Sequence, residues 1–198
     1  MNAAIRSPRF TPLHRALLWV MAIGILAMLF IGVGMVSTFG ARYLTLVSIH
    51  KPLGIAILVL AVLRLVVRLR FGAPSLPRDM PAPMKLAARL SHVLFYVLMI
   101  AMPLIGWAML SAADYPVVVA GLHLPAIVPA DAGLHSVLWN AHKLLAFAFF
   151  ALILVHLAAG LFHALVRRDG VFEAMAPYPA KMPVRLAANS AAIARNRR

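Results

Sequence analysis

The sequence predicts an all-α membrane protein whose helices form a four-helix transmembrane bundle. Of its 198 residues, 64% are hydrophobic and only 12% are charged, whereas soluble domains are closer to half apolar. The hydrophobic residues fall into four runs, each long enough to cross a bilayer as a helix of about twenty residues. Lysine and arginine gather beside alternate connections between these runs.

The four predicted spans occupy most of the chain. They run from about residue 13 to 36, 46 to 69, 90 to 110 and 138 to 166. Helices are favoured because they satisfy their own backbone hydrogen bonds inside the bilayer. The first run is too long for the core of a signal peptide, so we expect it to be a permanent span.

The connections between the spans differ in composition. Residues 37–42 mark a short turn, and residues 72–83 contain four prolines, which remove backbone donors and predict a loop. The segment 111–137 is long and mildly apolar, so we expect it to carry a short helix lying at the membrane surface. We expect one domain over residues 1–177, followed by a basic cytoplasmic tail over residues 178–198.

The basic residues predict the orientation of the bundle. Sixteen of the nineteen lysines and arginines fall near the termini and the proline-rich loop, and only Arg42, Lys51 and Lys143 fall on the opposite side. Because basic residues favour the cytoplasm, we expect both termini there. We assign the net charge of +14 to orientation and to contacts with membrane lipid, and we expect no nucleic acid partner.

The lack of cysteine narrows the possible chemistry. The chain has no Cys but eight His. Disulfides, iron–sulfur clusters, thiolate-ligated haem and covalently attached c-type haem are therefore excluded. Any metal would have to be held by histidine, methionine, carboxylate or backbone atoms.

Two histidines of the fourth span are placed to hold two haems. His142 and His156 are fourteen residues apart, which is close to four helical turns, so both rings project from nearly one face. The helical rise separates them by about 21 Å along the axis. This spacing suits two b-type haems at two depths, each taking one axial imidazole from this helix.

Depth selects the second imidazole for each haem. His50 begins the second span at the outer side, so we expect it to pair with His142 at the outer haem. His14 begins the first span at the inner side, so we expect it to pair with His156 at the inner haem. Any one of these four histidines alone would be interpreted as a packed or interfacial residue. Zinc stays open, although histidines four turns apart cannot bind the same ion.

Other polar residues receive weaker assignments. Arg64 lies about four turns after the histidine of the second span, and we expect it to bind an inner haem propionate or a quinone oxygen, unless it reaches to the headgroups. His92 opens the third span and either contacts a haem edge or quinone or is interfacial. His163 is an alternative inner ligand. We expect His123 and His135 to be solvated in the outer loop.

At these residues the chain resembles the bacterial cytochrome b561 family, which is related to the cytochrome b subunits of nickel–iron hydrogenases and formate dehydrogenases. The resemblance covers nearly the whole chain to about Pro177. Its motifs are Pro12-Leu13-His14, His50-Lys51-Pro52-Leu53-Gly54, the stretch from Arg64 to Arg68, His92, Pro103-Leu104-Ile105-Gly106, Ala141-His142-Lys143, Val155-His156 and Arg168-Asp169-Gly170-Val171.

This resemblance implies four helices, two b-type haems and a place in the bacterial inner membrane as a multi-pass protein. The family's ligand pattern falls on His14, His50, His142 and His156. Some members resemble superoxide oxidases, which take electrons from superoxide at the periplasmic face and pass them to ubiquinone. Others are quinone-linked electron carriers for a partner enzyme.

Our leading hypothesis is an oxidoreductase of the superoxide:quinone type. An outer donor would reduce the outer haem, and the electron would leave through the inner haem to ubiquinone or another membrane quinone. Lys51 and Lys143 each follow a predicted outer ligand, so we expect them to attract superoxide, although they would also suit ordinary contacts with headgroups.

Two other functions fit the same sequence. The chain could be a membrane-anchor cytochrome b subunit for a separate dehydrogenase or a soluble periplasmic redox protein. It could instead be a non-redox transporter or scaffold with structural histidines. A reduced-minus-oxidised absorbance spectrum separates the last alternative from the first two.

Overall fold

The computed structural model describes residues 10–72, 76–77 and 79–176. The predicted basic tail, residues 178–198, lies outside the described residues.

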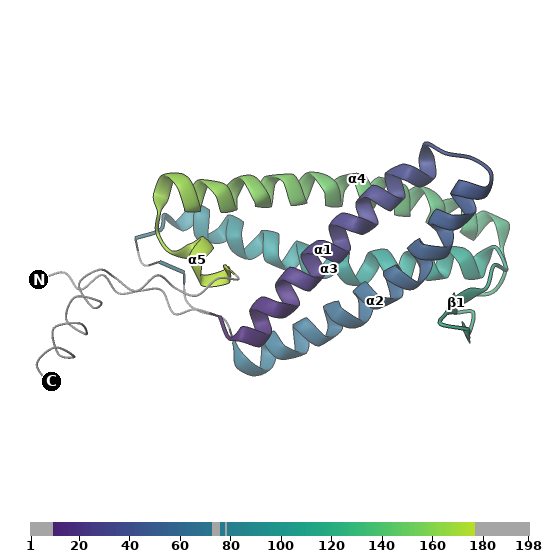
Figure 1. Ribbon diagram of the computed structural model, residues 1–198, viewed down its shortest axis with the longest axis horizontal. Helices are drawn as coiled ribbons and strands as arrows, with labels where there is room; N and C mark the ends of the chain where they lie inside the picture. Colours follow the sequence, from purple (N-terminus) through teal and green to yellow (C-terminus); the bar gives the residue numbers. More distant parts are fainter. Residues whose placement is uncertain (1–9, 73–75, 78, 177–198) are drawn as a thin grey trace, which may run out of the picture.

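Four long helices form the body of the molecule, as the sequence predicts (Figure 1). Each is long and apolar enough to cross a membrane. They alternate in direction, and their packing follows chain order: α1 on α2, α2 on α3 and α3 on α4. Their bounds are α1 Pro12–Val36, α2 Ala41–Phe71, α3 Ala82–Ala112 and α4 Ala132–Phe162.

Helices α2, α3 and α4 begin earlier than the hydrophobic runs indicate, at Ala41, Ala82 and Ala132 rather than at about residues 46, 90 and 138. α3 begins at Ala82, with a proline in its first turn, where the fixed φ and missing N–H of proline cost little. α4 begins at Ala132, where the Asp131 carboxylate accepts a 2.6 Å hydrogen bond from the backbone N–H of Leu134. Hydrophobicity marks the part of a helix that suits the bilayer, whereas the first turn of α3 contains a proline and that of α4 is capped by Asp131.

The predicted surface helix in segment 111–137 is wrong. The structure has a hairpin there, with β1 Val117–Val119 antiparallel to β2 Leu122–Leu124. Three successive valines favour a strand because β-branched side chains suit its pleated surface. Ala120 and Gly121 form the turn, with φ of 50° and 83°, the positive values that a two-residue hairpin turn requires.

The two ends of the bundle have different structures. At the hairpin end, α1 and α3 finish, α2 and α4 begin, and Val117 of β1 is buried close to α2 and α3. We call the opposite end the basic end. It carries one π-helical turn, His163–Arg167, and a short helix α5, Val171–Met175, near the start of α1 (Figure 1).

A small apolar layer lies midway between the two predicted histidine depths. Phe149 is seven residues from both His142 and His156, about 10 Å along the helix in each direction. It packs with Leu98 and Met99 of α3 in the buried core. This layer excludes water from the space between the two depths. The core is completed by Met21 of α1 and Ala61 of α2.

Helix α5 braces the first turns of α1. The backbone N–H of Phe10 donates to the Ala174 carbonyl at 3.3 Å. The Trp19 indole N–H donates to the Met175 carbonyl at 3.0 Å, and the Arg15 guanidinium donates to the next carbonyl, of Ala176, at 3.1 Å. The chain that follows α4 therefore helps to hold the part of α1 that carries His14.

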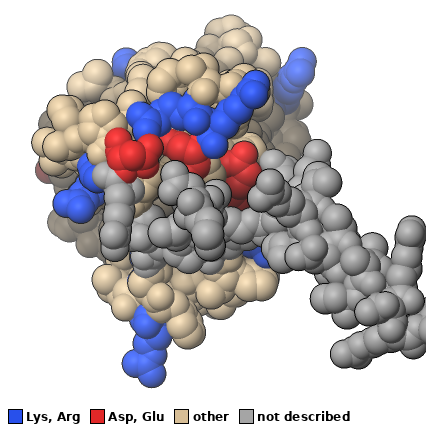
Figure 2. Space-filling model, turned by 90° about the vertical axis from the view of Figure 1, so that its left-hand side faces the viewer, with Lys and Arg blue, Asp and Glu red and all other residues tan. Residues whose placement is uncertain are grey.

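A buried carboxylate fixes the turn that leads into α5. The ring Nδ1 of His163 donates to Asp169 Oδ2 at 2.7 Å, and Arg167 Nε donates to the same oxygen at 2.9 Å. Burial by itself would raise the pKa of the Asp169 carboxyl, but these bonds and one from the Val171 N–H outweigh it and lower the pKa below its usual value. In Figure 2, which faces the basic end, acidic side chains lie directly beside basic ones.

We expect Asp169→Asn to destabilise the protein by about 1–3 kcal/mol near neutral pH, because a buried charged acceptor is lost. A lowered native pKa gives stability that is complete above the unfolded pKa, about 4, and is lost as pH falls through the native value. The difference in unfolding temperature between wild type and variant should therefore shrink from pH 7 to pH 3.

The matched control is Asp79→Asn. Asp79 contacts Arg167 at 3.4 Å, but its side chain is 75% exposed, so we expect an effect below about 1 kcal/mol. Equal destabilisation by the two variants at pH 7 would contradict a special role for Asp169.

Candidate functional site

At the hairpin end, α2 and α4 bring two histidines together. The ring centroids of His50 and His142 are 6.3 Å apart, and the ring planes are inclined at 65°. Two imidazoles that share one metal ion each lie about 2 Å from it at the bonding nitrogen. Adding the distance from each nitrogen to its ring centre gives a centroid separation of about 6 Å. The observed spacing therefore suits two axial ligands of one iron.

Residues of α2, α3 and the hairpin lie close to this pair. A Cβ atom added at Gly106 of α3 would lie 3.3 Å from Cε1 of the His142 ring, so only glycine leaves the ring its present room. A cavity of about 70 Å³ adjoins both rings and is closed on one side by Val117 of the hairpin. Lys51 also lines this cavity and donates from Nζ to the Pro116 carbonyl at 3.3 Å.

Near the basic end, the structure brings a different pair of histidines together from the one predicted. The ring of His156 lies 5.7 Å from that of His92 and 4.8 Å from the ring of Phe95, centroid to centroid. The His14 ring instead packs against Phe10 and Phe71. The pairing of His14 with His156 across one haem stays a prediction.

Arg64 of α2 connects these histidines electrostatically. Its guanidinium charge acts on the rings of His14, His92 and His156. Its NH1 atom is buried and has no hydrogen-bond partner among the described residues. The four side chains thus share one region, with a cationic donor available for an anionic or carbonyl oxygen.

The donor atoms present fit haem. The Nε2 atom of His14 and the Nδ1 atoms of His50 and His142 are buried, and within the described part of the chain they have no hydrogen-bond partner. Buried polar atoms are normally paired, so these nitrogens are available to a bound group. The described ranges contain no group of three or more side chains able to hold a metal ion. Histidine pairs suit haem iron, which needs only axial ligands from the protein. They suit zinc less well, because a zinc ion takes three or four protein ligands.

Of the predictions for the remaining histidines, one is confirmed, one is wrong and one stays a prediction. His123 is exposed in β2, as expected for the outer loop. His135 is not in a loop: it lies in the first turns of α4, half-buried, with its Nδ1 atom 2.9 Å from the Met109 carbonyl oxygen. The early start of α4 explains this error. His163 is buried and bonded to Asp169, and its role as an alternative inner ligand stays untested.

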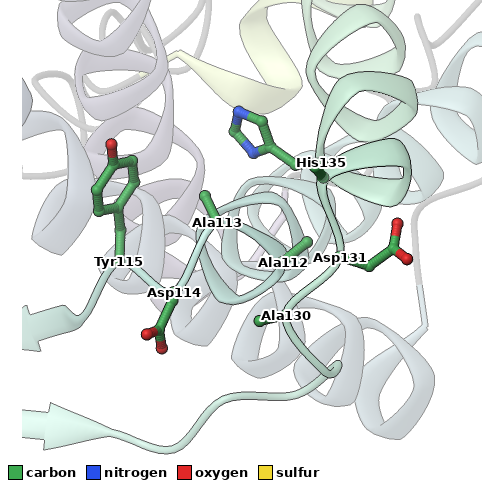
Figure 3. Close-up of a pocket in the computed structure, with 8 residues that line it drawn as sticks. Ala112, Ala113, Asp114, Tyr115, Ala130, Asp131 and His135 are labelled. Carbon is green, nitrogen blue, oxygen red and sulfur yellow. The ribbon is translucent and has the colours of Figure 1, made fainter.

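A second cavity is separate from the histidine pairs. It has a volume of about 440 Å³ and lies at the hairpin end, between the end of α3 and the start of α4. Its walls include His135, Tyr115 and two aspartates. Figure 3 shows the carboxylates of Asp114 and Asp131 directed away from each other, and Asp131 is already used as a helix cap. The cavity therefore does not form a converging ligand set.

Sequence reasoning missed several residues that shape the site. Thr11 bonds to the His14 ring at 2.7 Å, and a helix-capping search would have found it because it stands three residues before that histidine. Gly106 belongs to one of the family motifs, but the sequence does not indicate that it lies against the His142 ring. No local pattern indicates that Phe95 lies against His156 or that Val117 closes the outer cavity, because both contacts join distant segments.

Four apolar helices with imidazole pairs at two depths define the class of membrane-bound b-type cytochromes. The family model for prokaryotic cytochrome b561 matches residues 9–178. The chain therefore belongs to the prokaryotic cytochrome b561 family, and it is a multi-pass bacterial membrane protein. Haem binding and electron transport are properties of this family.

Named relatives agree with this assignment. The chain is 35% identical over 130 residues to the probable superoxide oxidase CybB of Yersinia pestis, covering 65% of this chain and 73% of that protein. It is 30% identical over 172 residues to cytochrome b561 homolog 2 of Escherichia coli (strain K12), covering 84% and 90%. Cytochrome b561 homolog 1 of the same organism is 28% identical over 137 residues, covering 69% and 78%.

Proposed function

We propose that this chain is a dihaem membrane cytochrome that oxidises superoxide at the hairpin end and reduces a membrane quinone. The observation that supports it most is the outer pair, His50 with His142 at 6.3 Å, beside a cationic side chain, Lys51, in the same cavity. The relative named as a probable superoxide oxidase supports the choice of donor.

The overall reaction balances as follows. Two superoxide anions each lose one electron and become dioxygen. One quinone takes up the two electrons together with two protons and becomes the quinol. When bound, haem supplies the one-electron chemistry, and the protein supplies binding, orientation and electrostatics.

Different residues of the chain attract superoxide, hold the haems and bind the propionate or quinone. Lys51 and Lys143 attract the superoxide anion to the hairpin end, where a field of one sign raises the encounter rate. His50 and His142 hold the outer haem, and Gly106 leaves room for the His142 ring. At the basic end, His14 and His156 hold the inner haem, with His92 beside it. The buried NH1 of Arg64 binds a propionate or quinone oxygen.

The same proposal sets the orientation in the bacterial inner membrane. The basic end faces the cytoplasm, where we expect both termini, and the hairpin end faces the periplasm. This follows from the scarcity of lysine and arginine at the hairpin end, where the described residues include only Arg42, Lys51 and Lys143. Anionic lipids are the expected partners of the basic end.

We expect alanine at His14 or at His156 to remove the same single haem. Alanine at His92 should keep both haems and shift only the potential of the inner one, because the proposed partner of His156 is His14 and His92 lies beside His156, 5.7 Å from ring centroid to ring centroid. Haem content by pyridine haemochrome and redox-resolved absorbance measure these outcomes. Loss of a haem in the His92 variant, with both retained in the His14 variant, would assign the ligand role to His92.

The function is tested on the purified holoprotein by rapid mixing with superoxide and a short-chain ubiquinone. We expect b-type absorbance bands, accelerated decay of superoxide and one quinol for every two superoxide anions consumed. Absence of b-type bands would overturn the cytochrome itself. Normal bands with no response to superoxide would overturn the donor and favour the role of an anchor subunit for another dehydrogenase or a soluble redox protein.

A further inference from the structure

The ring of His14 is held by a hydrogen bond to a side chain. The residue is only 4% exposed, and its ring Nδ1 atom lies 2.7 Å from the hydroxyl oxygen of Thr11. The corresponding Nδ1 atoms of His50 and His142 are buried without a hydrogen-bond partner in the described ranges. Within this comparison, only the ring of His14 is oriented by a side chain.

The environment of the ring selects its protonation pattern. If the threonine hydroxyl donated to Nδ1, the proton would sit on Nε2, which is buried and has no partner among the residues described. A buried donor without an acceptor is unfavourable. The favourable arrangement has Nδ1–H donating to Thr11 Oγ1 and the Nε2 lone pair free to bind.

The same hydroxyl oxygen also fixes the start of α1. The backbone N–H of His14 donates to Thr11 Oγ1 at 3.3 Å, so Thr11 is the N-cap of the helix. Two donors of His14, one from the ring and one from the backbone, therefore converge on one oxygen atom. The first turn of α1 sets both where the ring lies and which nitrogen it presents.

We propose that Thr11 is a positioning residue that holds His14 for iron ligation and lowers the reduction potential of its haem. This inference rests on the proposed role of His14 as an axial ligand. Donation from Nδ1–H to an oxygen makes an imidazole a stronger electron donor at its other nitrogen. A stronger axial donor stabilises the oxidised iron, and the potential falls.

Three substitutions separate positioning from capping. Thr11→Ser keeps both roles. Thr11→Gly removes the ring's acceptor but keeps a good N-cap residue. Thr11→Val preserves the shape of the side chain and removes both roles. In the holoprotein, we expect glycine and valine to raise the midpoint potential of one haem and change its low-spin electron paramagnetic resonance signal, with haem content retained. Serine should match the wild type.

The control for capping alone is Asp131→Ala, which removes the cap of α4 at a residue that contacts none of the predicted iron ligands. It should lower thermal stability without moving either potential. If the Thr11→Val variant fails to assemble with haem, the potentials of the Thr11→Gly and Thr11→Ser variants are compared instead. Unchanged potentials and spectra in the glycine variant would overturn the role of Thr11. Retention of both haems by His14→Ala would instead overturn the ligand role on which it rests.

Discussion

Replacing His142 by alanine should remove one haem and leave the other, so that about half of the b-type absorbance is lost. His142 supplies one of two imidazoles at the outer position, and its ring lies 6.3 Å from that of His50. The single imidazole that remains would not be enough to retain a haem that has no covalent attachment to the protein. Redox-resolved absorbance and haem-to-protein ratio of the purified variant measure the loss.

Three further variants extend this test. His50→Ala should lose the same haem as His142→Ala, and the double variant should lose no more than either single one, because both residues serve one iron. His135→Ala is the matched control: it lies two turns earlier on α4 but contacts the Met109 carbonyl rather than another histidine. Loss of different haems from the two single variants would disprove the pairing.

Replacing Lys51 and Lys143 together by glutamine should slow the reaction with superoxide by about tenfold or more at low ionic strength. These lysines follow directly after the two outer histidines, and Lys51 lines the cavity that adjoins both rings. Glutamine removes the charge but keeps a donor for the Pro116 carbonyl, which Lys51 now contacts at 3.3 Å. Rapid mixing with superoxide over a range of salt concentrations measures the effect.

The dependence of the reaction rate on salt distinguishes electrostatic attraction of superoxide from a structural defect in the variant. The difference between wild type and variant should narrow as salt rises, because screening acts over about 10 Å at 0.1 M ionic strength. Arg89→Gln, at an exposed position near the start of α3 at the basic end, should not change the rate. Equal rates for wild type and the double variant at low salt would remove the lysines from the mechanism.

Features of the fold were predictable from the sequence where they depend on the residues of one segment alone. The hydrophobic runs located all four helices, because crossing a bilayer demands a fixed length of apolar helix. The spacing of His142 and His156 followed from the helical rise alone. The Thr11 cap of α1 lies within one turn of His14, so it too was open to local reasoning. The hairpin was missed because its short strands depend on a turn between them and on helices beneath Val117.

Contacts between distant segments were decided by tertiary structure. The meeting of His92 with His156, the bracing of α1 by α5 and the bonding of Asp169 to His163 all join separate parts of the fold. Such contacts depend on how each helix is rotated about its own axis. A membrane helix is apolar toward lipid and toward its neighbours alike, so its hydrophobic pattern does not reveal that rotation.

The sequence by itself therefore determined the class of protein, the four crossings and the depths at which imidazoles occur, since each follows from apolar length and helical rise along one segment. Only the tertiary structure decided which rings face each other and which side chains from distant segments pack against them. The physical reason is that side-chain packing between helices, not the uniform hydrophobicity of their surfaces, sets the rotation and contact of each span.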